Sequence, residues 1–438
     1  MIIYQVLARL FGSGKFSAFD SRSLGFLKDL GITHVWYTGV LRHSSGKPYV
    51  KGEIGSPYSI ADYYDVNPYL ANKEEDRLAE FERLIKRTHK AGMKVILDLV
   101  PNHVSPDYSD SHGGIPTLGR YDYDWTDTDK IDFSKRRSWD ALEDIVSFWC
   151  SKGVDGFRCD MIELVPVDFF AEMIARTRQK YPGTVFIGEC YVISNYKIYL
   201  NTGHFDYLYD KSGLYDTLRG VVAEQRPAYD ITANWQMLGP LQGRMLNFLE
   251  NHDEQRIGSP WFAGSAKKGY CALAVSALFF PAPFMLYFGQ EIGEAALDGH
   301  EGRTSIFENV AHIRPYGKLG AYQQEVLARY REVLHLASEL EGAANFDLGY
   351  FQSERLGFDR RRHFAFLRYT DENCVLVACN FSSEDAEMTL CIPSDAPQAL
   401  GSEVKVNIPA WNFVVLRKHC NFATLFCGQI NTNNSIKK

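Results

Sequence analysis

The segment GFRCD at residues 156–160 places a fixed positive charge close to a carboxylate. Side chains alternate along a β-strand, so Arg158 and Asp160 are expected to point to the same face. A carboxylate beside a fixed cation stays ionised at neutral pH, which suits it to attack carbon or to stabilise positive charge. A purely structural ion pair is the alternative, and other segments of the chain weigh against it.

Three further apolar segments also turn polar at their C-terminal ends. They are VILDLVPNH at 95–103, VFIGE at 185–189 and MLNFLENHD at 245–253. Each reads as a buried strand followed by residues that could do acid–base chemistry or bind a polar ligand. The polar residues delivered in this way are Asp98, Asn102, His103, Glu189, Glu250, Asn251, His252 and Asp253.

Amphipathic stretches at 74–91, 138–151 and 166–181 separate these strands and predict helices. Strands that alternate with helices indicate a parallel sheet. In a (β/α)₈ barrel the C-terminal ends of all strands converge on one face, so the polar ends are expected to share one pocket. The eight strands are predicted near 2–11, 33–40, 94–100, 155–160, 185–189, 205–210, 245–251 and 283–288, with a closing helix at 321–339.

The same motifs resemble a known family. DLVPNH (98–103), GFRCD (156–160), the glutamate of IGEC (187–190) and ENHD (250–253) are similar, in order, to the four signature regions of the α-amylase family of glycoside hydrolases. The resemblance extends from Ile3 to about Lys418. It implies that Asp160 is the nucleophile, Glu189 the general acid/base and Asp253 the stabiliser of the transition state.

The resemblance also implies a sugar-binding set around these carboxylates. Arg158, His103 and His252 would serve the subsite beside the scissile bond, and Asp98 would brace the arginine. Tyr58 matches a tyrosine that stacks under the reacting ring, and a loop-packing aromatic is the alternative for it.

The implied chemistry needs two carboxyl groups in different protonation states. Asp160, beside Arg158, is suited to attack the anomeric carbon as an anion. Glu189 follows an apolar strand, and burial would raise its pKa toward the range where it can hold a proton. The α anomer would be retained through a covalent glycosyl–enzyme.

Several departures from the family pattern leave the substrate open. Many α-amylases have Lys-His three and four positions after the nucleophile, where this chain has Glu163 and Leu164. No cofactor is required for the chemistry. Asn102 matches a usual calcium ligand, but its partners in the 104–137 insert cannot be assigned, so a calcium site and a structural role for Asn102 both stay open.

The predicted fold class is α/β, a (β/α)₈ barrel with a short insert after strand three and a C-terminal antiparallel β-sandwich. The barrel is assigned to 1–103 and 138–344, and the domain B-like insert to 104–137. Short alternating runs assign the sandwich to 345–418. The remaining 419–438 is predicted to be a tail.

Composition limits the partners. A net charge of −7 and an isoelectric point near 6.0 argue against nucleic acid and anionic membranes. The longest apolar run, 272–288, is interrupted by Pro281 and Pro283, so no membrane span is predicted. The start of the chain does not resemble an export signal, and nine cysteines without metal-like pairing are typical of buried thiols, so a cytoplasmic location is predicted.

These observations together predict a retaining hydrolase that cleaves α-1,4-glucosidic bonds in glucan or malto-oligosaccharides. A transglycosylase or α-glucosidase of the same family is the first alternative, because it would share the same carboxylates. A non-catalytic barrel homologue is the second. The sequence does not predict the oligomeric state.

Overall fold

Eight parallel strands close into a barrel in the computed structural model, which describes residues 1–121, 125–307 and 312–419. The order around the barrel is β1-β13-β12-β11-β10-β9-β5-β2. The strands are β1 (Ile2–Leu7), β2 (His34–Thr38), β5 (Lys94–Leu99), β9 (Gly156–Cys159), β10 (Val185–Gly188), β11 (Tyr207–Tyr209), β12 (Met245–Phe248) and β13 (Phe284–Tyr287). All eight lie within or next to the predicted ranges, and the predicted fold class is confirmed.

The barrel strands are apolar on both faces because both faces are buried. Side chains pointing inward form one core in the barrel interior, and their neighbours pack outward against the helices. On β2, for example, Trp36 lies in the interior core while Val35 and Tyr37 belong to the surrounding core. The interior set comprises Ile3, Trp36, Ile96, Ile187, Tyr209, Tyr215, Leu246, Phe248 and Met285.

The helices cover the outside of the barrel. In α2 (Arg77–Lys90) the buried residues Phe81, Leu84 and Ile85 recur at helical spacing, so one stripe faces the strands. The predicted helices at 74–91, 138–151, 166–181 and 321–339 correspond to α2, α3 (Arg136–Ser151), α4 (Val167–Lys180) and α9 (Ala321–Glu339). The others are α1 (Ser21–Asp29), α5 (Tyr196–Asn201), α6 (Asp216–Val222), α7 (Asp230–Leu238) and α8 (Tyr270–Ala274).

Two long connections at the C-terminal ends of the strands carry small sheets of their own. The connection from β2 to α2 holds the hairpin β3 (Leu41–His43) and β4 (Ile60–Val66). The insert after β5 holds β6 (His103–Val104), β7 (Thr117–Arg120) and β8 (Asp129–Ile131) in the order β6-β8-β7. No strand was predicted in either connection. The strands of the insert, β6, β7 and β8, have only 2, 4 and 3 residues and show too few alternations to be recognised.

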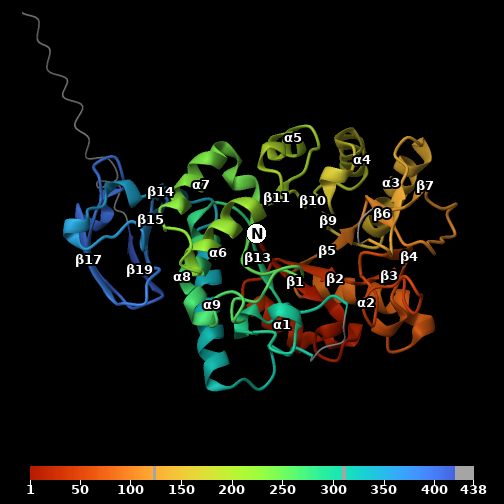
Figure 1. Cartoon of the computed structure of the whole chain (residues 1–438), viewed down its shortest axis with the longest axis horizontal. Helices are drawn as coiled ribbons and strands as arrows, with labels where there is room; N and C mark the ends of the chain where they lie inside the picture. Colours follow the sequence, from red (N-terminus) through yellow and green to blue (C-terminus); the bar gives the residue numbers. More distant parts are fainter. Residues whose placement is uncertain (122–124, 308–311, 420–438) are drawn as a thin grey trace, which may run out of the picture.

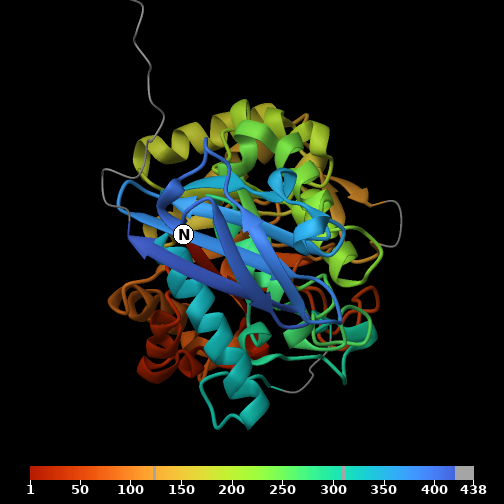
Figure 2. The ribbon, with the colours of Figure 1, turned by 90° about the vertical axis from the view of Figure 1, so that its left-hand side faces the viewer.

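The C-terminal part forms two antiparallel sheets with their own core. One sheet has the order β14-β15-β16-β19 and the other pairs β17 with β18. Their bounds are β14 (Ala344–Asp347), β15 (His363–Tyr369), β16 (Asn373–Asn380), β17 (Ala386–Cys391), β18 (Glu403–Ile408) and β19 (Asn412–His419). These blue strands lie at one end of the molecule and the insert at the other (Figure 1), and Figure 2 views the same strands in front of the barrel.

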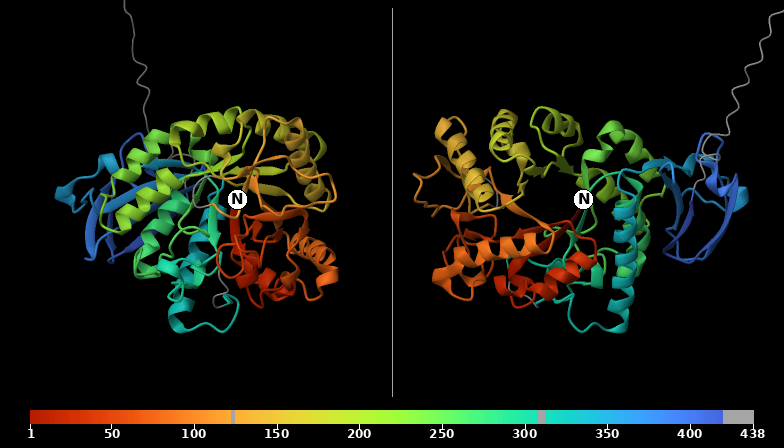
Figure 3. Two further views of the ribbon diagram at one scale, coloured as in Figure 1. Left: turned by 45° about the vertical axis from the view of Figure 1, so that its right-hand side comes forward. Right: turned by 180° about the vertical axis from the view of Figure 1, so that it is seen from behind.

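Helix α9 stands between the barrel and the C-terminal sheets (Figure 3). The buried guanidinium of Arg368 on β15 joins these layers by donating to the carbonyls of Leu340 at 3.0 Å and Ala343 at 2.8 Å. Burial lowers the pKa of Arg368 to about 10. No helix within residues 1–121, 125–307 and 312–419 is long and apolar enough to cross a membrane.

Candidate active site

The polar strand ends meet in one cavity at the C-terminal end of the barrel. Strand register explains part of this, because Asp98 on β5 and Ile187 on β10 both pair with Arg158 on β9. The residues that follow these strands therefore emerge at similar heights. The cavity has a volume of about 250 Å³ and is lined by Lys51, Ser56, Tyr58, His103, Trp125, Asp127, Thr128, Asp160, Met161, Glu189, Tyr191, His252, Asp253 and Phe307.

Six of the seven residues predicted for catalysis and sugar binding line this cavity, and Arg158 lies fully buried beneath it. The guanidinium of Arg158 joins two of the carboxylates. Its Nη1 donates to Asp160 Oδ1 at 2.5 Å, and its Nη2 forms an ion pair with Glu189 Oε1 at 2.8 Å. Asp98 Oδ1 lies 3.8 Å from Nη1. The planar fork of one arginine thus holds Asp160 and Glu189 side by side.

Aromatic rings fix the arginine in this orientation. The guanidinium carbon of Arg158 lies 5.5 Å from the ring centre of Trp36 and 5.4 Å from those of Tyr58 and Tyr209. Such contacts attract a cation and exclude water from it. The Trp36 indole also donates to Asp98 Oδ2 at 3.1 Å. Asp98 therefore contacts both Trp36 and Arg158 and helps to fix their orientation.

Three carboxyl groups near Arg158 have raised pKa values. Burial raises the pKa of Glu189 and raises that of Asp98 to about 7, while the charge of Arg158 opposes both shifts. Burial and the negative charge of Glu189 raise the pKa of Asp253 to about 8, and water that reaches 42% of its side chain opposes this rise. Carboxyl groups with different proton affinities within one site are suited to acid–base chemistry.

Both histidines of the site are held neutral. Burial lowers the pKa of His252 well below its ordinary value and lowers that of His103 to about 4. His252 Nδ1 faces the Gln5 amide nitrogen at 2.8 Å, so this ring nitrogen accepts and Nε2 carries the hydrogen. His252 Nε2 lies 2.6 Å from the Tyr58 hydroxyl and 3.2 Å from Asp253 Oδ2. Because the Tyr58 hydroxyl donates to Asp98, the Nε2–H of His252 donates to that hydroxyl.

Tyr58 lies half-buried against His252, with ring centres 5.0 Å apart and an interplanar angle of 20°. Its hydroxyl donates to Asp98 Oδ1 at 3.4 Å. The ring therefore forms a fixed apolar surface beside Asp160 in the cavity wall. Flat aromatic surfaces of this kind suit the apolar face of a sugar ring.

Eight residues of the cavity wall were not predicted as site residues, and three of them make contacts that bear on the site. Tyr191 donates from its hydroxyl to Glu189 Oε1 at 2.6 Å. Asp127 is buried, and its Oδ2 has no hydrogen-bond partner among the described residues. Trp125 lines the cavity near His103, with ring centres 5.5 Å apart. Tyr191 lies two positions after Glu189, which is a weak signal, whereas nothing in the aperiodic insert singles out Asp127 or Trp125.

The described residues do not show a calcium site at Asn102. Its side-chain oxygen accepts a hydrogen bond from the Tyr121 hydroxyl, and its amide nitrogen faces His103 Nδ1 at 2.9 Å. Residues 1–121, 125–307 and 312–419 contain no group of three or more His, Cys, Asp or Glu side chains that could hold a metal ion. Among the described carboxylates of the insert, Asp107 contacts Ser105, Asp110 contacts Tyr108, Asp129 contacts Arg120 and Asp132 contacts Ser134, whereas one oxygen of Asp127 has no hydrogen-bond partner there.

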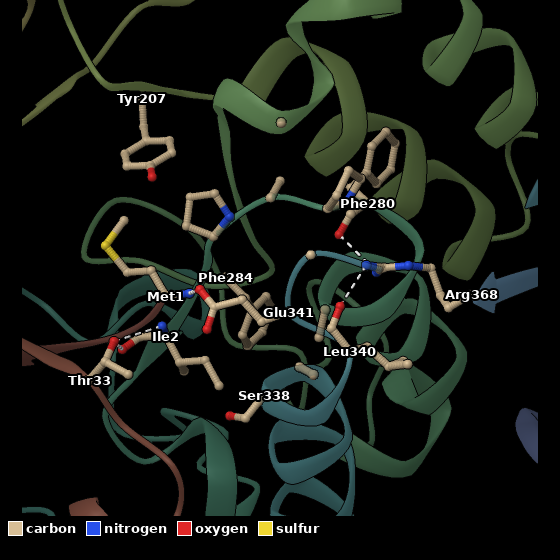
Figure 4. Close-up of a pocket in the computed structure, with 17 residues that line it drawn as sticks. Met1, Ile2, Thr33, Tyr207, Phe280, Phe284, Ser338, Leu340, Glu341 and Arg368 are labelled. Atoms are coloured by element: carbon tan, nitrogen blue, oxygen red, sulfur yellow. Dashed lines mark hydrogen bonds and ion pairs between the residues drawn. The ribbon is translucent and has the colours of Figure 1, made fainter. Parts of the chain in front are cut away.

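A second cavity lies at the opposite end of the barrel (Figure 4). It has a volume of about 140 Å³ and is bordered by residues that begin the strands, such as Ile2, Tyr207 and Phe284. The charged groups beside it already have partners within the protein, since Arg368 is bonded to backbone carbonyls and the terminal amine of Met1 lies 3.4 Å from Glu341. In barrels this end serves stability, and the chemistry lies at the other end.

Comparisons with known proteins agree with the arrangement of the strand-end residues. Residues 21–117 and 120–314 match the family described as alpha amylase, catalytic domain. The Alpha-amylase MalA of Haloarcula japonica is 26% identical over 441 residues, which cover 92% of this chain and 58% of the relative. Neopullulanase 2 of Thermoactinomyces vulgaris is 23% identical, over 84% of this chain and 63% of the relative. The chain thus spans 58% and 63% of the length of these two relatives.

The fold is also that of a solved relative. The crystal structure of an alpha-amylase from Lactobacillus plantarum superposes with a TM-score of 0.73 at 22% identity, over 95% of this chain and 98% of the other. The resemblance predicted from the four motifs is confirmed. Because the catalytic-domain match covers more than half of the sequence and includes all four motifs, the chain belongs to the alpha-amylase family.

Proposed function

We propose that this chain is a retaining glycoside hydrolase that cleaves α-1,4-glucosidic bonds in glucan or malto-oligosaccharides. The observation that carries the proposal is the pair Asp160 and Glu189 on adjacent nitrogens of Arg158. Two carboxyl groups flank the scissile bond in most glycosidases, and their separation decides the stereochemical course. The names of the relatives above support an α-glucan as the substrate class.

In the first step, an oxygen of Asp160 forms a bond to the anomeric carbon while the glycosidic oxygen leaves. Glu189 gives its proton to that leaving oxygen. The raised pKa of Glu189 supports this role, because the group must hold a proton near neutral pH. In the second step, water gives a proton to Glu189 and attacks the anomeric carbon, which releases Asp160 and restores both groups.

The close spacing of the pair favours retention of configuration. Retaining enzymes hold their carboxyl groups about 5–5.5 Å apart, whereas inverting enzymes leave about 6.5–9.5 Å for a water molecule. Two carboxylates in contact with one guanidinium are held near each other, which supports the shorter of these separations. A covalent glycosyl–enzyme on Asp160 is the consequence.

The remaining residues act on the charge and position of the sugar. Asp253 faces the cavity and would stabilise the positive charge that develops at the anomeric carbon. His252 Nε2–H would exchange the Tyr58 hydroxyl for a sugar hydroxyl as its acceptor, and the Tyr58 ring would support the apolar face of the sugar. The proposed chemistry uses side chains alone and needs no cofactor.

The proposal is tested by product analysis. Maltoheptaose is incubated with the protein, and the anomer released first is followed by proton NMR while the product sizes are separated by chromatography. We expect shorter malto-oligosaccharides with the α anomer formed first. Release of the β anomer would contradict the retaining course, and products longer than maltoheptaose would favour the transglycosylase alternative.

A further inference from the structure

Glu163 departs from the family pattern, and it holds a neighbouring loop in place. Glu163 lies in the 3₁₀ turn Ile162–Leu164, close after Asp160. Its Oε2 accepts a hydrogen bond from the backbone N–H of Tyr191 at 2.8 Å, and its Oε1 accepts one from the Asn195 side chain at 2.7 Å. The N–H of Val192 lies 3.3 Å from both oxygens. One carboxylate therefore ties down the loop that follows β10.

This loop carries Tyr191 against Glu189. The Tyr191 hydroxyl donates to Glu189 Oε1 at 2.6 Å, on the same oxygen that Arg158 Nη2 approaches at 2.8 Å. Glu189 Oε2 accepts from the backbone N–H of Met161 at 2.8 Å. Both oxygens of Glu189 thus have donors, and the Tyr191 donor lies on the wall of the cavity. Burial and the charge of Glu189 raise the pKa of Tyr191, so its phenol stays protonated as a donor.

We propose that Tyr191 is a positioning residue that holds Glu189 in its reactive orientation, and that Glu163 holds Tyr191 in place. The proposal rests on the proposed role of Glu189 as general acid and base. A donated hydrogen bond stabilises the ionised carboxylate more than the neutral acid. Tyr191 therefore limits the rise in proton affinity that burial causes, and it supports Glu189 in the second step, where Glu189 acts as a base.

Other groups around Glu189 also affect its protonation equilibrium. They come from three strand ends and from the turn after β9, and they are Arg158, Asp160, Tyr209, Asp253 and the N–H of Met161. Substitution of Tyr191 leaves all of them in place. A change in the pH dependence of the Tyr191 variant then reports the lost phenol.

The test is Tyr191→Phe, which keeps the ring and removes the hydroxyl. General-acid activity is lost as pH rises through the pKa of Glu189, so a higher pKa moves the alkaline limb of kcat/KM to higher pH. We expect an upward shift of about one unit, because the variant loses one hydrogen bond to a charged group. Hydrolysis of maltoheptaose should also fall more than hydrolysis of α-glucosyl fluoride, whose leaving group needs little protonation. Tyr229→Phe serves as the matched control, because Tyr229 is exposed and directly precedes α7.

The role of Glu163 is tested by a double-mutant cycle. Glu163→Gln should produce part of the same shift, and its combination with Tyr191→Phe should add nothing further, because both act through one hydrogen bond. The proposal would be overturned if the pH dependence of kcat/KM in Tyr191→Phe matched that of wild type. It would also be overturned if the shifts of the two single variants added up in the double variant. If Glu163→Gln does not fold, Tyr191→Phe alone decides.

Failure of this proposal can be distinguished from failure of the proposed function. If wild-type protein cleaves maltoheptaose and Glu189→Gln selectively loses that activity, the general acid is established whatever Tyr191 does. If Glu189→Gln affects both substrates equally, the proposed role of Glu189 itself is wrong.

Discussion

Replacement of Arg158 by lysine separates the charge of this residue from its geometry. Arg158 reaches Asp160 at 2.5 Å and Glu189 at 2.8 Å through two different nitrogens. A lysine ammonium is a single point charge and cannot span both carboxylates in this way. Arg158→Lys should therefore lose either the hydrogen bond to Asp160 or the ion pair with Glu189, while it keeps a cation in the buried site.

The magnitude follows from that single lost bond. A hydrogen bond to a charged group contributes about 1.5–3 kcal/mol, and each 1.4 kcal/mol corresponds to a tenfold change in rate. We expect kcat/KM of Arg158→Lys to fall about 10- to 150-fold. Arg158→Met removes the cation altogether and leaves Asp98, Asp160 and Glu189 buried without it. Breaking a buried pair in this manner costs about 3–5 kcal/mol of folding stability, so Arg158→Met should be both less active and less stable.

The assay compares maltoheptaose with α-glucosyl fluoride for each variant. A larger loss on maltoheptaose would indicate that lysine keeps Asp160 and releases Glu189, and equal losses would indicate the reverse. Thermal unfolding measures the stability of each variant. Arg176→Lys is the control, because Arg176 is half exposed and pairs with Glu143 and Glu172 outside the cavity. An Arg158→Lys protein within twofold of wild type, or an Arg158→Met protein that matches it, would refute the reasoning.

Three further predictions follow from the same geometry. Asp160→Asn should lower hydrolysis to below about a hundredth of wild type without loss of folding, since a neutral amide cannot attack carbon. Asp168→Asn, on the exposed side of α4, is the control. Higher residual activity on a slow glycoside would count against Asp160 as nucleophile. Glu189→Gln should reduce maltoheptaose cleavage far more than α-glucosyl fluoride cleavage. It should also abolish the alkaline limb of kcat/KM, because that limb reports the loss of the Glu189 proton as pH rises, and burial raises the pKa of this group. Extensive chelation should leave melting temperature and activity unchanged, because the Asn102 oxygen is already bonded to Tyr121; a clear fall in melting temperature would show that a metal binds.

Much of the candidate site could be predicted because its residues stand on barrel strands or directly after them. Alternation along β9 places Arg158 and Asp160 on one face, and the structure joins them by a hydrogen bond. Convergence of parallel strand ends brings Glu189 and Asp253 to the same cavity. The predicted rise in the pKa of Glu189 also agrees with the structure, because the apolar strand before it leads into a buried environment.

The parts that could not be predicted depend on the paths of loops. The bond from Tyr191 to Glu189 requires the loop after β10 to turn back, and Glu163 of a neighbouring turn is what holds that loop. The buried carboxylate of Asp127 reaches the cavity from the insert, whose strands are too short to show a period. The bond of Asn102 to Tyr121 joins residues 19 positions apart, and it decides how the amide oxygen is used.

The sequence by itself determined the barrel, the strand ends that carry the carboxylates and the family, because these rest on local periodicity and on motifs that contain their own spacing. Only the tertiary structure decided how the protons are distributed, through the sharing of Arg158 among Asp98, Asp160 and Glu189. It also decided which donors reach Glu189. Proton affinity depends on burial and on charges within a few ångströms, and residues distant in the sequence supply both only after the chain has folded.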